Sequence, residues 1–98
     1  NRVYPSEQFL GALAALPEDS RRHVLYQPER LLMVPGRIVR VGIADESISG
    51  NIEIGFEFQA GTLTRVVFLP GREWAVWQIR TMLEGKKVDN SPASAPMQ

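Results

Sequence analysis

Apolar and polar side chains alternate without interruption over residues 51–59 (NIEIGFEFQ), and the apolar positions are Ile52, Ile54, Phe56 and Phe58. A period of two places these side chains on one face of a β-strand. A second apolar stretch, residues 62–69 (TLTRVVFL), follows after a short segment that ends in Gly61. The pattern therefore predicts a β-hairpin over residues 51–69, around which the remaining elements are arranged.

The turn of this hairpin decides which side chains of its second strand face the core. A three-residue loop over residues 59–61, with Gly61 at positive φ, pairs Ile54 with Val66. A two-residue loop at residues 60–61 would instead place Arg65 opposite Phe56 on the buried face, so we favour the first register. The opposite face of the sheet then also carries apolar side chains, namely Leu63, Val67 and Leu69.

Helical periodicity marks both ends of the chain. Residues 6–16 carry apolar side chains on one side, at Phe9, Leu10, Leu13 and Leu16. A second, short helix is expected over residues 18–26, between Pro17 and Pro28. A carboxy-terminal helix is expected over residues 72–84, with Gly85 at the position of a C-cap glycine.

Two further strands are expected between the amino-terminal helices and the hairpin. Residues 31–34 form a short apolar run that suits an edge strand. Residues 37–43 read as a strand that joins the hairpin, with Val39, Val41 and Ile43 on one face and Ile38 and Arg40 on the other. Residues 1–4 are expected to be a loose lead-in, and residues 44–50 a polar loop.

Together these elements predict an α+β fold. It consists of an amino-terminal helix or helical hairpin, a three- to four-stranded antiparallel sheet, and a carboxy-terminal helix packed on the sheet. Residues 1–88 form a single domain in this interpretation. Residues 89–98 (DNSPASAPMQ) are small, polar and proline-containing, and we expect them to be a disordered tail.

The carboxy-terminal helix has an unusual distribution of large side chains. On a helical wheel its main apolar stripe contains Ala75, Val76, Ile79, Met82 and Leu83. Trp74 and Trp77 lie away from this stripe. Three interpretations follow: the amino-terminal helix packs on the tryptophans, another subunit or protein covers them, or they stack on a ligand.

Composition narrows the functional classes. The 98 residues include 11 basic and 11 acidic side chains, so the formal net charge is zero. Nonspecific binding to nucleic acid or to an anionic membrane needs a basic excess, and neither partner is expected. There is no cysteine, and no apolar run approaches the length of a membrane span. We expect a cytoplasmic protein.

No catalytic constellation is visible, and an enzyme is not expected. His23 is the only histidine and has no partner residues at metal-ligand or catalytic spacing, so no metal and no cofactor are predicted. Glu53 and Glu57 share a strand face about 13 Å apart, whereas paired glycosidase carboxylates lie roughly 5–9.5 Å apart. Cross-strand pairing with Arg40 and Arg65 explains both glutamates.

One short pattern resembles a known family. Residues 45–50 (DESISG) fit D-x-S-x-x-G, and Arg21 and Arg22 precede them in the chain. This is similar to the two motifs of PilZ domains, β-barrels that bind cyclic di-GMP, although Leu25 and Tyr26 stand where a second arginine would complete R-x-x-x-R. The resemblance implies a ligand-binding regulatory domain with a degenerate arginine motif. Its ligand contacts would be Arg21, Arg22, Asp45 and Ser47.

The interpretation that we favour is a small, non-catalytic protein-interaction domain that self-associates as a dimer or higher homo-oligomer. The contact surface would be either the side of the carboxy-terminal helix that carries the tryptophans or the outer sheet face. The candidate interface residues are Trp74, Trp77, Leu63 and Val67. The PilZ-like regulatory domain is the alternative.

Overall fold

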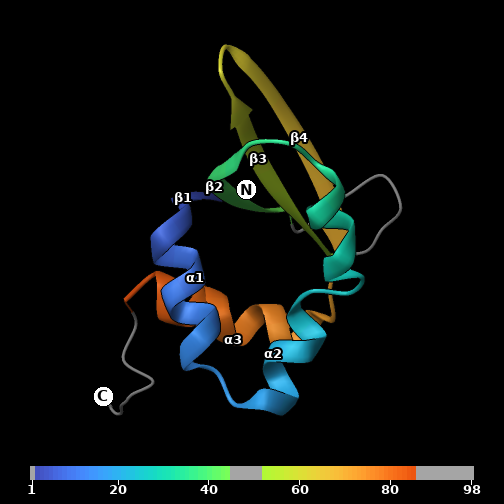
Figure 1. Ribbon diagram of the computed structural model, residues 1–98. Coiled ribbons are helices and arrows are strands. Elements are labelled where there is room, and N and C mark those ends of the chain that lie inside the picture. The colour runs from blue at the N-terminus through green and yellow to red at the C-terminus, as the bar shows by residue number, and fades with distance from the viewer. Residues whose placement is uncertain (1, 45–51, 86–98) are drawn as a thin grey trace.

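The computed structural model describes residues 2–44 and 52–85 (Figure 1). In chain order the elements are β1 (Arg2–Pro5), α1 (Ser6–Ala15), α2 (Glu18–Val24), the 3-10 helix η1 (Pro28–Met33), β2 (Arg37–Ala44), β3 (Glu53–Ala60), β4 (Leu63–Pro70) and α3 (Glu73–Leu83). The predicted α+β class is confirmed. Most of the expected loop over residues 44–50 and the whole expected tail over residues 89–98 lie outside the described residues.

The four strands form one antiparallel sheet in the order β1-β2-β3-β4. Figure 1 shows α1, α2 and α3 gathered on one side of this sheet. The core lies between that side, here called the inner face, and the helices. Phe9 of α1 meets Phe56 of β3 edge to face, with ring centroids 5.9 Å apart, a geometry that adds about 0.5–1.5 kcal/mol to the burial of the two rings.

The amino terminus is a strand rather than the expected lead-in. Arg2–Pro5 pairs with β2 so that Tyr4 lies opposite Val41 and Val3 opposite Gly42. Tyr4 points to the inner face and is 7% exposed, whereas Val3 points outward. Four residues are too few for a periodic signal, and it is pairing with β2 that makes this segment a strand.

Residues 31–34 are not the expected edge strand, because residues 28–33 form the 3-10 helix η1. Pro28 occupies its first turn, and Gln27 before it adopts a left-handed conformation with φ of 59°. Side chains three residues apart share a face in such a helix. Leu31 and Val34 accordingly pack against the core, whereas Leu32 and Met33 are 85% and 83% exposed.

The hairpin is confirmed, but its expected register is wrong. Ala60 pairs with Leu63, so the turn has two residues and begins at Gly61, with φ of 61°. Glycine at the first central position suits a two-residue hairpin turn. The change reverses the faces of β4, because side chains alternate along a strand. Leu69 and Val67 therefore lie opposite Ile54 and Phe56 on the inner face, and Val66 and Phe68 point outward.

A β-bulge changes the expected faces of β2. The register shifts between Ile38 and Arg40, since Ile38 pairs with Phe58 and Arg40 with Glu57. The extra residue lets Ile38 join Val41 on the inner face, instead of sharing the outer face with Arg40. Ile38 packs against the core as a result.

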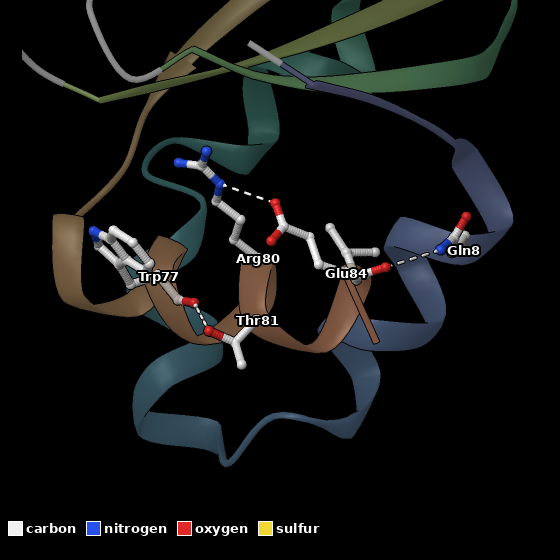
Figure 2. A network of polar contacts seen from close by, with 6 residues as sticks. Gln8, Trp77, Arg80, Thr81 and Glu84 are labelled. Atoms are coloured by element: carbon white, nitrogen blue, oxygen red, sulfur yellow. Dashed lines mark hydrogen bonds and ion pairs between the residues drawn. The ribbon is translucent and has the colours of Figure 1, made fainter. Parts of the chain in front are cut away.

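The carboxy-terminal helix has the predicted buried stripe, made of Ala75, Val76, Ile79 and Leu83 with Met82 partly buried. These side chains belong to the core that the sheet also lines, and α3 contacts both α1 and α2. Figure 2 shows Gln8 of α1 reaching the end of α3, where its Nε2 donates to the carbonyl oxygen of Leu83 at 3.3 Å. Gly85 follows the helix with φ of 70°, as expected of a C-cap glycine.

Candidate functional site

The face of the sheet turned away from the helices, here called the outer face, carries an unusual row of residues. Val3, Gly42, Gly55 and Phe68 lie side by side across the four strands, one from each. The next row consists of Pro5, Arg40, Glu57 and Val66. The two central strands thus present two directly paired glycines, and the two edge strands present apolar side chains.

Phe68 lies over one of these glycines. A Cβ placed on Gly55 would stand 2.7 Å from Cε1 of Phe68, so the ring occupies the space of the missing side chain. Gly42 is different, because a Cβ there would meet only the Arg2 carbonyl oxygen at 3.4 Å and Cγ2 of Val3 at 3.6 Å. The ring thus fills the space of a side chain at Gly55, whereas Gly42 has room for a methyl group in ordinary van der Waals contact.

These features form a shallow groove of about 220 Å³ across the outer face. Arg40 and Glu57 stand in its wall, joined by two hydrogen bonds from Nε and Nη2 to the two carboxylate oxygens, at 2.9 and 2.8 Å. The hydrogen bonds from Arg40 lower the pKa of Glu57, against a weaker opposing effect of burial. This confirms the predicted pairing of Arg40 with Glu57, but Arg65 lies opposite Phe58 on the other face and takes no part in it.

Large apolar side chains are exposed on this face, where a solvated sheet face normally carries polar side chains. Val3 is 62% exposed, and Val66 and Phe68 are each 50% exposed. The candidate residues Leu63 and Val67 are not among them, because the corrected register places them on the inner side. Val67 packs partly against the core, and Leu63 is 72% exposed beside the turn.

Trp74 and Trp77 form a second exposed apolar surface along α3, with 47% and 54% of each residue exposed. The ring of His23 on α2 lies 5.3 Å from that of Trp74, centroid to centroid. Arg80 lies over the Trp77 ring at 5.4 Å, and its Nε contacts Glu84 at 3.5 Å (Figure 2). The partial cover of Trp74 thus comes from α2 and not from the first amino-terminal helix that one of the three interpretations named, and both tryptophans remain about half exposed.

Only two of the four PilZ-like candidate residues lie within the described part of the chain. Arg21 and Arg22 lie exposed on α2, and Nη2 of Arg22 is 3.6 Å from the carboxylate of Asp19. Asp45 and Ser47 lie outside the described residues.

No grouping of three His, Asp or Glu side chains suited to a metal ion occurs within the described ranges. The helices of the described part are also too short or too polar to cross a membrane.

Two residues that shape the outer face, Gly42 and Phe68, were not predicted as site residues. The available signal was Gly55, a glycine in an outward position of an otherwise regular strand, which often marks a close approach by another group. Identifying that group as Phe68 requires the register of the hairpin, and the register expected from the sequence is wrong.

Comparisons of the chain with protein-family models, with curated proteins and with solved structures found no match.

Proposed function

We propose that the protein is a non-catalytic interaction domain that self-associates through the outer face of its sheet. The observation that carries this proposal is the exposure of Val3, Val66 and Phe68 on the sheet face that the helices leave uncovered. An antiparallel sheet with one solvated face normally presents polar side chains there. Burying these apolar side chains against a second copy removes them from water and stabilises the assembly.

A second copy is the occupant that we favour for a physical reason. Most soluble oligomers are symmetric, and a two-fold interface uses the same patch on both subunits. The outer face combines apolar edges, a central groove and both members of an ion pair, so it holds complementary features within one patch. The tryptophan surface of α3 is the competing contact surface.

Solution mass tests the proposal. Sedimentation velocity and light scattering over about 1 µM to about 1 mM span weak and moderate affinities. We expect the mass to rise with concentration from the 11.0 kDa of one chain toward twice that value. Val66→Asp places a charge in the proposed interface and should keep the protein monomeric.

The matched control is Leu32→Asp, which removes an exposed apolar side chain from η1, outside the outer face. This variant should associate like the wild type. A mass that stays at 11.0 kDa over the whole range would overturn the proposal. Loss of association in Trp74→Ala plus Trp77→Ala, with Val66→Asp still associating, would assign the contact to α3 instead.

A further inference from the structure

We infer that two copies of this chain pack their outer faces together about a two-fold axis. This axis lies between the two sheets, parallel to the strands, and passes over the boundary between β2 and β3. This inference rests on the proposed self-association and specifies its geometry. Two observations on the outer face carry it: the unequal filling of the space above Gly42 and Gly55, and the opposite charges of β2 and β3.

The two glycines supply shape complementarity. Phe68 covers Gly55, whereas a Cβ on its neighbour Gly42 would make only ordinary van der Waals contacts, and Gly42 lines the groove of the outer face. Rotation about the stated axis places β3 of one copy over β2 of the other. The partner's Phe68, which covers the partner's Gly55, then lies above Gly42. Each ring therefore fills the hollow beside the other ring, and the glycines let the two sheets approach closely.

The charges supply a second reason for this axis. The outward side chains of β2 include Arg37 and Arg40, and those of β3 include Glu53 and Glu57. The stated axis sets Arg40 over the partner's Glu57 and Glu57 over the partner's Arg40, so four charges alternate in sign. A two-fold axis perpendicular to the strands would instead set β2 over the partner's β2 and β3 over the partner's β3, so that strands of like charge face each other, an unfavourable arrangement.

The edges of the two faces match in the same arrangement. The backbone of Val3 lies opposite that of the partner's Phe68, whose ring leans inward over Gly42. Pro5 likewise lies opposite the partner's Val66, so apolar residues meet on both flanks of the charged centre. Four strands with about six residues each give a face of about 400 Å², which is below the roughly 800 Å² per partner of a standard interface. We therefore expect a reversible dimer that forms at micromolar or higher concentrations.

A charge exchange tests the axis. The variant Arg40→Glu plus Glu57→Arg keeps an ion pair within each chain and, under the stated axis, keeps opposite charges across the interface. It should self-associate like the wild type. A mixed dimer of wild type and variant, however, sets Arg40 against an arginine and Glu57 against a glutamate. Mixed dimers should fall about tenfold or more below their statistical share.

The readout is native mass spectrometry of an equimolar mixture in which one chain carries a heavy isotope. A mixture of labelled and unlabelled wild type gives the statistical share. Depletion of the mixed dimer supports the stated axis, whereas mixed dimers at or above the statistical share would overturn it. In that case the wild type still dimerises and the proposed function stands. Absence of any dimer of the wild type would instead remove the proposed function itself.

Discussion

The ring of Phe68 on β4 covers Gly55 on β3, so that a Cβ on the glycine would stand 2.7 Å from Cε1 of the ring. The two residues are direct cross-strand partners. An aromatic side chain over a strand glycine shields backbone that the glycine leaves bare. The contact thus supports the sheet within one chain, and it also holds the ring at the position from which a second copy would be contacted.

This contact predicts different effects at the two paired glycines. Gly55→Ala forces Phe68 off its neighbour, and we expect the free energy of unfolding to fall by about 1–2 kcal/mol. Gly42→Ala serves as the control, because its new methyl group meets atoms only at 3.4 and 3.6 Å. Its stability should be unchanged or higher by about 0.5 kcal/mol, since alanine restricts the unfolded chain. Urea unfolding of both variants measures the difference, and equal losses of stability would contradict the assignment.

The place of Gly42 in the lining of the groove gives a second prediction. A methyl group at this position occupies the hollow that the partner's Phe68 would enter. Gly42→Ala should therefore raise the dissociation constant of the dimer by about tenfold, equivalent to about 1.4 kcal/mol, while leaving the monomer folded. Sedimentation equilibrium measures the constant. Unchanged association in this variant, together with unchanged stability, would mean that no side chain enters the hollow.

The register of the hairpin shows which features of the fold can be predicted from the sequence and which cannot. The strict alternation from Ile52 to Phe58 predicts β3 and its buried face correctly. In β4, however, Val66 and Val67 are adjacent apolar residues, so two opposite registers both place apolar side chains on the core. The choice depends on tertiary contacts, namely the burial of Leu69 in the core and the position of Phe68 over Gly55. Periodicity along a single strand contains neither contact.

The candidate site was predictable to a similar extent. The sequence places Trp74 and Trp77 away from the buried stripe of their helix, and the structure confirms this position but leaves both about half exposed, which the sequence did not predict. The pairing of Arg40 with Glu57 was also expected from the sequence. The groove was not, because Gly42 and Gly55 become neighbours only when β2 and β3 pair with a bulge at residues 38–40.

The two tryptophans should differ in their contribution to stability. Trp74 packs against His23 of α2, with ring centroids 5.3 Å apart, whereas Trp77 contacts Arg80 of its own helix. Trp74→Ala should lower the free energy of unfolding by about 1–2 kcal/mol, because it removes a contact between two helices. Trp77→Ala should lower it by about 0.5 kcal/mol, as expected for an exposed cation–π contact. Thermal and urea unfolding measure both, and a larger loss at Trp77 would contradict this order.

Glu57 should contribute to the acid sensitivity of the fold. The hydrogen bonds from Arg40 lower its pKa in the folded protein below the usual value of 4.5. A lowered pKa stabilises the fold at pH values above 4.5 and loses this contribution as the pH falls through the folded pKa. Stability should therefore decline less steeply below about pH 5 in Glu57→Gln than in the wild type. Glu29→Gln on η1 is the control, and urea unfolding from neutral to acidic pH is the measurement. Parallel curves for wild type and Glu57→Gln would show that the pair contributes nothing to folding.

Tyr4 predicts a change of stability at alkaline pH. Its hydroxyl is buried near Glu84 without a hydrogen bond of good geometry in the described part of the chain, and burial, followed by the negative charge of Glu84, raises its pKa above 10.0. A raised pKa gives stability that is present below pH 10.0 and is lost as the pH rises toward the folded pKa. Tyr4→Phe keeps the aromatic ring in the core and removes the ionisable group, so it should lose less stability than the wild type above that pH.

The same variant should be more stable than the wild type at pH 7. Burying a hydroxyl group without a hydrogen bond costs about 1–3 kcal/mol, and phenylalanine avoids this cost at Tyr4. We expect the free energy of unfolding to rise by about 1 kcal/mol. Tyr26→Phe controls for general loss of a tyrosine, since Tyr26 is only partly buried. If Tyr4→Phe is less stable than the wild type at pH 7, the hydroxyl must be hydrogen-bonded in the folded protein, and Glu84 is then the acceptor to test by Glu84→Gln.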